Sequence, residues 1–241
     1  ENTMSEFRTY AIILAAGSGS RMQADQNKML LEINGRTLLD LCLERFSKNA
    51  AIDHIFTVIA PEDMTYIKET EEYRGPEGFV AGGKTRQDSV FNGLKAVEKH
   101  ATGFSGRVLV LIHDGARCFV PSAVLGRVLS ALQSERCAAV ATLPVTDTIR
   151  QVEALVLKDL IAPRDELLQM QTPQAADLDI LLYAFELAKK EDVQATDDIA
   201  LLLRIGYPVR AVCGDKRNLK LTTPADLELA HLLYEAGYFY E

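Results

Sequence analysis

Short, almost continuous apolar runs recur along this 241-residue chain, and longer segments with a different spacing of apolar positions separate them. Such short runs predict strands that are covered on both faces, as in a parallel sheet. They occur at 10–15, 55–60, 78–81, 108–112 and 138–143. Between and after them, apolar residues fall three to four positions apart, which is the spacing of one helix face. These helical segments are 37–48, 85–99, 121–134, 177–190, 197–204 and 224–236.

Strands and helices in alternation predict an α/β fold with a mostly parallel sheet. We expect a Rossmann-like, three-layer α/β/α sandwich with a mostly parallel mixed sheet. Two late apolar segments, 209–212 and 218–221, predict further strands, and Pro61 can begin a helix after 55–60. With no linker or repeat in view, the order predicts one domain over residues 7–241.

Residues 145–165 interrupt this order. The segment 145–150 alternates and then becomes polar, and 152–161 has the composition of a returning strand. This pattern predicts a hairpin that projects from the domain as a β-arm.

Composition restricts the class of protein. Apolar residues make up 48% and charged residues 25%, so we expect a packed core. No apolar run is long enough to cross a bilayer and no secretory segment is evident, which predicts a cytoplasmic protein without a membrane partner. The four cysteines form no CxxC pair, so they indicate reduced thiols rather than a zinc or redox motif.

A net charge of −8 argues against binding to nucleic acid or to an anionic membrane. Any phosphate ligand therefore needs local cations. The loop after the first strand provides them, because Gly17 and Gly19 allow close backbone approach to an anion and Arg21 and Lys28 add charge. A strand that leads into such a loop is typical of nucleotide-binding α/β proteins.

Two other motifs compete with this loop. The dinucleotide fingerprint G-x-G-x-x-G is only half present, since Met22 occupies the third glycine position, and this argues against a pyridine-nucleotide dehydrogenase. Residues 78–85 satisfy the phosphate-loop pattern G-x-x-x-x-G-K-[ST], which would indicate a P-loop NTPase. A polar turn precedes that motif instead of a strand, and its own apolar residues fit a strand that ends at a Gly82–Gly83 turn.

Several separated motifs resemble one family. Residues 14–21 with Lys28 resemble the signature of nucleotidyltransferases that activate sugars and polyols. The remaining segments resemble the cytidylyltransferase branch, and in particular the 2-C-methyl-D-erythritol 4-phosphate cytidylyltransferases. These segments are 82–83, Arg86, 88–89, 113–117, 147–148, Arg164, 172–174, 196–197 and 218–220. The resemblance runs from Tyr10 to about residue 232.

The chain departs from the family pattern at Gly115 and Cys118, where alanine and proline are more usual. Glycine predicts a more flexible turn there, and Cys118 predicts a free thiol near the site. Neither change removes a charged group.

The resemblance implies an enzyme that joins CTP to methylerythritol phosphate with Mg²⁺ and releases pyrophosphate. It also implies a homodimer in which the 145–165 arms exchange between subunits, so that arm residues complete the neighbour's site. Catalytic roles fall on Arg21, Lys28, Arg164 and Lys220. Nucleotide binding falls on Ala15, Ala16, Gly17, Gly19, Gly83, Arg86 and Ser89. Substrate binding falls on Arg117, Thr148 and Thr172, and metal binding on Asp114.

Taken singly, these residues have simpler explanations. Gly17 and Gly19 fit an ordinary turn, Lys220 and Arg164 fit solvated surface charges, and Asp114 fits a helix cap. His113 fits a structural position at a strand end. Residues 196–198 fit a helix N-cap, and 172–174 fit a turn shaped by proline. Only the ordered set of motifs supports the enzymatic interpretation.

Three other functions stay open. A ribitol 5-phosphate cytidylyltransferase would share the fold and most of the motifs. A non-catalytic regulatory domain would share the fold but lack the loop cations, whereas this chain keeps Arg21, Lys28 and Lys220. A P-loop NTPase would depend on Lys84.

Overall fold

The computed structural model describes residues 6–17, 27–64, 77–159 and 162–240. A seven-stranded sheet runs through the centre, in the order β11-β7-β10-β6-β1-β4-β5. Its strands are β1 (Phe7–Leu14), β4 (His54–Ile59), β5 (Phe79–Ala81), β6 (Arg107–Asp114), β7 (Ala138–Pro144), β10 (Leu168–Asp177) and β11 (Val209–Cys213). The main helices are α1 (Leu38–Ser47), α3 (Arg86–His100), α4 (Ser122–Ser134), α5 (Leu178–Lys190), α6 (Asp198–Arg204) and α7 (Pro224–Glu235).

The sheet is mixed and mostly parallel, as predicted. β1 pairs in parallel with β4 and β6, β4 with β5, and β7 with β11. The antiparallel strand is β10, which lies between β6 and β7. Register pairs Leu14 with both Val58 and Asp114, so β1, β4 and β6 end side by side.

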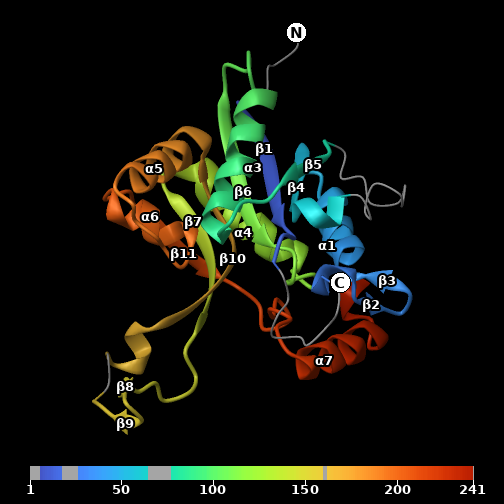
Figure 1. Cartoon of the computed structure of the whole chain (residues 1–241), viewed down its shortest axis with the longest axis vertical. Helices are drawn as coiled ribbons and strands as arrows, with labels where there is room; N and C mark the ends of the chain where they lie inside the picture. The colour runs from blue at the N-terminus through green and yellow to red at the C-terminus, as the bar shows by residue number, and fades with distance from the viewer. Residues whose placement is uncertain (1–5, 18–26, 65–76, 160–161, 241) are drawn as a thin grey trace.

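Apolar side chains form one core on each face of the sheet. Helices α1, α4 and α7 contribute to the first core, and α3, α5 and α6 contribute to the second. The strands alternate between the two, since Ala11 and Ile13 face the first core while Tyr10 and Ile12 face the second. The three-layer α/β/α sandwich is therefore confirmed, and Figure 1 shows helices on both sides of the sheet.

Three helices begin with the same N-terminal capping motif. Thr37, Thr85 and Thr223 are N-caps, and in each case an aspartate three residues later completes a capping box. These boxes satisfy backbone N–H groups that have no partner inside the helix. Asp197 caps α6 by accepting from the Ala200 N–H, as predicted for 196–198.

Two secondary-structure predictions were wrong, and one pair of strands was not predicted. Residues 218–221 form no strand. Residues 172–174 lie inside β10 instead of forming a turn, and the Thr172–Pro173 bond within it is cis. A short pair of strands, β2 (Glu32–Ile33) with β3 (Arg36–Thr37), had no counterpart in the prediction. Pro61 does begin a helical turn, the 3-10 helix η3 (Pro61–Asp63).

The predicted arm is present, although its strands pair differently. β8 (Val152–Glu153) pairs with β9 (Val156–Leu157), so both strands lie within the segment expected to return. Ala154 and Leu155 connect them with positive φ angles of 47° and 64°, which suit the tight turn of a two-residue hairpin. Figure 1 shows this arm projecting away from the layered body.

None of the helices within the described ranges combines the length and the apolarity that a bilayer span requires. The four cysteines are all free. Cys42, Cys118 and Cys137 are buried, and Cys213 is exposed.

Candidate nucleotide pocket

A pocket of about 550 Å³ opens where β1, β4 and β6 end. Ligands of α/β proteins commonly bind at this edge, outside the carboxyl ends of the strands. The lining residues are Leu14, Ala15, Ala16, Gly17, Lys28, Met29, Ala60, Pro61, Glu62, Gly83, Lys84, Thr85, Arg86, Ser89, Asp114, Ala116, Lys220 and Thr222. The pocket thus brings together nine residues that the sequence singled out, from Ala15 to Lys220.

The loop after β1 forms one wall. Ala15 donates its N–H to the Val58 carbonyl at 2.7 Å, and the Asn27 side chain donates to the Ala15 carbonyl at 3.0 Å. These contacts fix the backbone as it leaves the strand, while Gly17 faces open space. Gly19 and Arg21 lie outside the described residues.

Lys28 reaches the pocket from a short 3-10 helix, η2 (Lys28–Leu30). Asn27 caps this helix by accepting from the Met29 N–H at 3.0 Å. The Lys28 Nζ lies 3.5 Å from the Leu221 carbonyl oxygen, next to the segment that carries Lys220. Two lysines far apart in the sequence therefore enter the same pocket.

The turn before α3 forms a second wall. A Cβ at Gly83 would lie 2.2 Å from the Asp88 Cβ, so this position requires glycine. The Ser89 hydroxyl accepts from the Gly83 N–H and donates to the Thr85 carbonyl, each at 3.0 Å. The Ser89 hydroxyl thus fixes the turn, and Gly83 and Ser89 both line the pocket.

This geometry also explains the phosphate-loop motif at 78–85. Phe79–Ala81 is strand β5 and Thr85 caps α3, so the apolar residues of the motif form a strand that ends at the predicted turn. A P-loop needs a flexible loop at that place. Lys84 and Thr85 nevertheless line the pocket, although neither was among the predicted nucleotide-binding residues.

Asp114 is the charged centre of the pocket. Its carboxylate lies 2.8 Å from the Lys220 Nζ, and the Nε atoms of Arg86 and Arg117 each lie 3.7 Å away. Burial alone would raise the pKa of Asp114, but these cations outweigh burial and lower the pKa to about 2. The carboxylate is therefore ionised at neutral pH, and its contacts are those of an ion-pair cluster rather than of a helix cap.

Arg86 is held from the side of α6. Two of its nitrogens donate to the Asp198 carboxylate, at 2.9 and 2.8 Å. Burial would lower the pKa of Arg86, but Asp198 raises it above the ordinary value. Most of the guanidinium fork is thus occupied by Asp198, a residue that the sequence had assigned only to a helix start.

The remaining predicted residues of the body lie behind the pocket. Thr172 is buried, and its hydroxyl accepts from the Asp114 N–H at 3.1 Å and contacts His113 Nδ1 at 3.0 Å. Arg117 donates to the Asn218 carbonyl at 2.8 Å. Burial lowers the pKa of His113 to about 4, so this imidazole is neutral and structural. Thr172 and Arg117 contact Asp114 directly, and His113 contacts Thr172, so all three support the position of Asp114.

The two predicted arm residues lie elsewhere. The Arg164 side chain is about half exposed and donates to the Thr146 carbonyl at 3.2 Å, and Thr148 is also exposed. Neither lines the pocket. Within one chain they are surface residues.

Gly115 differs from the flexible turn that was predicted, whereas Cys118 is a free thiol, as predicted. A Cβ at Gly115 would lie 2.9 Å from the Leu14 carbonyl oxygen and 2.8 Å from the Met29 methyl carbon, so the turn is closely packed. Cys118 is fully buried, and burial raises the pKa of its thiol to about 12, which makes it a poor nucleophile.

Comparisons with known proteins agree with this geometry. The family model of 2-C-methyl-D-erythritol 4-phosphate cytidylyltransferase (IspD) matches residues 9–236. The enzyme of that name from Geotalea uraniireducens is 40% identical over 227 residues, with 92% of this chain and 95% of the relative covered. The one from a Synechococcus species is 39% identical over 234 residues, covering 95% and 97%.

A solved structure adds to this. The crystal structure of 4-diphosphocytidyl-2C-methyl-D-erythritol synthase from Anaerococcus prevotii superposes with a TM-score of 0.80 at 31% identity. The alignment covers 96% of this chain and 98% of that one. Fold, motifs and relatives agree, and the chain belongs to the 2-C-methyl-D-erythritol 4-phosphate cytidylyltransferase family.

Proposed function

We propose that this enzyme transfers CMP from CTP to 2-C-methyl-D-erythritol 4-phosphate in the pocket at the carboxyl ends of β1, β4 and β6. The products are 4-diphosphocytidyl-2-C-methyl-D-erythritol and pyrophosphate. The observation that supports this best is the ionised Asp114, surrounded by Lys220, Arg86 and Arg117 beside a strand-end loop. Two phosphorylated substrates need such a concentration of fixed charge.

The reaction needs positioning more than proton transfer. A phosphate oxygen of the polyol attacks the α-phosphorus of CTP in line, and the bond to the β-phosphate bridging oxygen breaks. Because that attacking phosphate is already ionised at neutral pH, no general base is required. The neutral, buried His113 is consistent with this, since its two ring nitrogens contact Thr172 and the Arg117 carbonyl.

Charge stabilisation falls to the lysines of the pocket. Lys28 and Lys220 both line the pocket, and the Lys28 Nζ lies 3.5 Å from the carbonyl oxygen of Leu221, so both lysines can reach a triphosphate bound there. Fixed cations of this kind stabilise the additional charge at the α-phosphorus without reorganisation. Arg21 would add a further cation, although it lies outside the described residues.

Base recognition falls to the turn before α3. The close packing of Gly83 against Asp88 and the hydrogen bond from the Gly83 N–H to Ser89 fix the backbone there. A fixed backbone offers N–H and carbonyl groups in constant positions, which suits the edge of one pyrimidine. In the neighbouring loop after β1, Ala15, Ala16 and Gly17 would contact the nucleotide through their backbone.

Asp114 fits a magnesium ion. Mg²⁺ prefers carboxylate oxygens and often binds through one or two of them together with substrate phosphates. Asp114 is ionised and lines the pocket; its Oδ2 lies 2.8 Å from Lys220 Nζ, whereas its Oδ1 lies 3.7 Å from Arg86 Nε. We propose that this oxygen holds the metal, which when bound supplies positive charge beside the triphosphate.

We also propose that the active form is a homodimer made by arm exchange. The exposed fractions are 96% for Leu155, 61% for Val156 and 69% for Leu157, and such an apolar surface favours burial against another chain. Arg164 and Thr148 would then reach the neighbour's pocket and bind the polyol phosphate together with Arg117. The four free thiols are consistent with the cytoplasm as the location.

Pyrophosphate release tests the proposal. Each of CTP, UTP and ATP would be offered with methylerythritol phosphate and, separately, with ribitol 5-phosphate, in Mg²⁺ and after chelation. We expect turnover with CTP and methylerythritol phosphate only, and its loss on chelation. A higher kcat/KM with ribitol phosphate would reassign the substrate, and no pyrophosphate from any pair would indicate a non-catalytic domain.

A further inference from the structure

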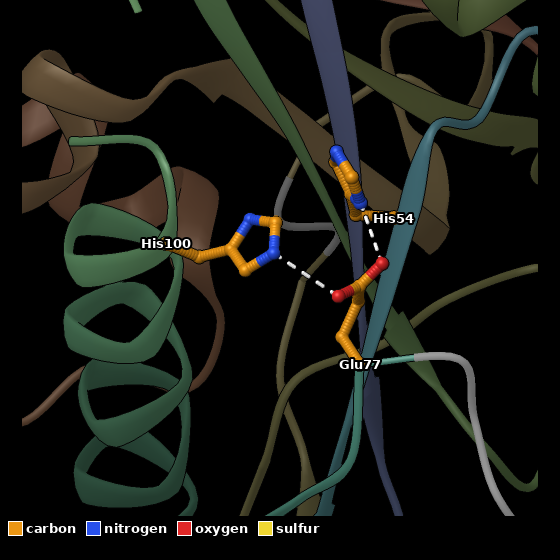
Figure 2. A group of neighbouring side chains, drawn as sticks. All are labelled: His54, Glu77 and His100. Atoms are coloured by element: carbon orange, nitrogen blue, oxygen red, sulfur yellow. Dashed lines mark hydrogen bonds and ion pairs between the residues drawn. The ribbon is translucent and has the colours of Figure 1, made fainter. Parts of the chain in front are cut away.

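A second polar cluster lies at the opposite end of the sheet. His54 begins β4, Glu77 precedes β5, and His100 is the last residue of α3. The far ends of the same elements, near Ala60 and Arg86, line the nucleotide pocket. Figure 2 shows the three side chains converging on one point between these elements.

The carboxylate of Glu77 connects both imidazoles. Its Oε1 lies 2.6 Å from His54 Nδ1, and its Oε2 lies 3.0 Å from His100 Nε2. The possible ligand atoms of the three residues all lie within 4.8 Å of one another. Tetrahedral zinc with ligand bonds of about 2.0–2.1 Å needs ligand atoms roughly 3.3 Å apart, so binding would draw both imidazoles and the Glu77 carboxylate inward.

Tyr10 lies where it can orient both imidazoles. His100 Nδ1 is 3.0 Å from the hydroxyl of Tyr10, which is fully buried. A tyrosine hydroxyl can donate or accept, so it can hold His100 with the proton on Nδ1 and the lone pair on Nε2. Histidine ligands of metals usually have such a partner on the second nitrogen. His54 stacks on the Tyr10 ring with centroids 4.7 Å apart, which fixes its orientation.

The donor set matches zinc. Two imidazole nitrogens and one carboxylate are a common protein ligand set for Zn²⁺, with water in the fourth position. Mg²⁺ and Ca²⁺ prefer oxygen ligands, so they do not fit this cluster. The cysteine pattern gave no sign of the site, because its ligands come from positions 54, 77 and 100 and include no cysteine.

We propose that His54 Nδ1, His100 Nε2 and the Glu77 carboxylate form a Zn²⁺ site that ties β4, the approach to β5 and the end of α3 together. The site is structural, since it lies away from the nucleotide pocket and needs no substrate. Zinc replaces the protons through which Glu77 and the two imidazoles are connected in the metal-free protein.

Zinc binding to the full, metal-stripped chain tests this. Titration with Zn²⁺ alone, against a fluorescent chelator and without nucleotide, should give one tight site per chain. At about 100-fold excess of zinc over its Kd, Tm should rise by roughly 5–10 °C. Co²⁺ in the same site should give the visible absorption bands of a tetrahedral ion.

Substitutions locate the site. Zinc binding should weaken by roughly 10-fold to 100-fold or more in each of His54→Gln, His100→Gln and Glu77→Gln. Tyr10→Phe should weaken it less. His231→Gln, in a half-buried histidine of α7, is the matched control and should bind zinc like the wild type. Circular dichroism without metal checks that each variant is folded.

Two outcomes would overturn the site: no stoichiometric zinc binding, or equal binding in the His54→Gln and His100→Gln variants. Zinc that is lost in Asp114→Asn and kept in His54→Gln would place the ion in the nucleotide pocket and also overturn it. CMP transfer in Mg²⁺ should be unchanged in His54→Gln, so failure of the zinc site is distinguishable from failure of the proposed function.

Discussion

The pocket and the arm both contain residues of the proposed reaction, but those of the pocket are buried and paired whereas those of the arm are exposed. In the pocket, charged side chains are paired inside one chain: Asp114 contacts three cations, and Arg86 is also bound by Asp198. In the arm, Arg164 is about half exposed and apolar side chains such as Leu155 face solvent. Folding preorganises the pocket, whereas the arm of a single chain exposes the residues that we propose complete a neighbouring site.

The contrast indicates what fixes the side-chain positions in each region. Burial makes the pocket costly to disturb, because removal of one partner leaves a buried charge uncompensated. The arm has little burial to lose within one chain, so its contribution should depend on assembly. Four substitutions separate the two halves.

The largest effect should come from Lys28→Ala. Loss of one preorganised cation at the α-phosphorus should lower kcat by roughly 10²–10³ while leaving the fold intact. Steady-state pyrophosphate release measures the rate, and thermal unfolding checks the fold. Lys216→Ala, at an exposed lysine outside the pocket lining, is the matched control. Near-normal turnover of Lys28→Ala would remove this lysine from the mechanism.

The burial of His113, behind the pocket, should make the stability of the protein depend on pH. The pKa of this histidine is lowered from the ordinary 6.5 to about 4, so between these values the unfolded chain binds more protons than the folded one. Stability should therefore fall as pH falls from 6.5 to 4, by about 3 kcal/mol in total. Asp114 adds a further loss only between pH 3.8 and about 2, as it becomes protonated.

Urea unfolding at a series of pH values tests this. His113→Gln should flatten the slope between pH 6.5 and 4, whereas the arm variant Arg164→Ala should keep the wild-type slope. An unchanged slope in His113→Gln would show that other groups titrate in that window.

Arg164→Ala tests the arm. If the arm serves the neighbouring subunit, this variant should lose roughly 10-fold to 100-fold in kcat/KM, as expected when a hydrogen-bonded charge contact is removed. Arg150→Ala, at another exposed arginine of the arm, should change little.

A mixing experiment sharpens the same point. Lys28→Ala and Arg164→Ala inactivate different halves, so a mixed dimer retains one pocket and one arm that are both intact. Random reassociation should restore roughly a quarter of the wild-type activity, since half of the dimers are mixed and each has one intact site. Mixtures no more active than their components would mean that each arm serves its own chain.

The smallest effect should come from Lys84→Ala. Lys84 lines the pocket, but its motif forms a strand and a helix cap instead of a phosphate loop. We expect a change in KM for CTP of a few-fold at most and an unchanged kcat, measured by pyrophosphate release. An inactive Lys84→Ala enzyme would revive the P-loop interpretation.

Most of the fold could be predicted from local pattern. The apolar runs located β1, β4, β6 and β7 because strands covered on both faces consist mainly of apolar side chains. Strand β10 was missed, since its buried residues include Gln171, Thr172 and Gln174, and their hydrogen-bond partners come from elsewhere in the chain. A polar strand of this kind is visible only once its partners are in place.

The site divides in the same way. The motifs located the backbone turn at Gly83. They also singled out Asp114 and Lys220, which form an ion pair in the structure. No local signal indicated that Arg86 would bind Asp198, 112 positions away, or that Lys84 would face the same pocket as Lys28. Contacts of this kind depend on topology, which single-sequence periodicity does not contain.

The antiparallel strand β10 has a consequence for anyone who would exchange arms between relatives. It begins at Leu168, next to the arm, and continues to Thr172, which accepts from the Asp114 N–H, although its pairing with β7 shifts register between Met170 and Gln174. A chimera joined inside this stretch with one residue added or removed would turn the side chains on one side of the junction to the opposite face. The arm is therefore not a detachable module, and a graft has to carry β10 with it as far as the threonine that supports the acidic centre.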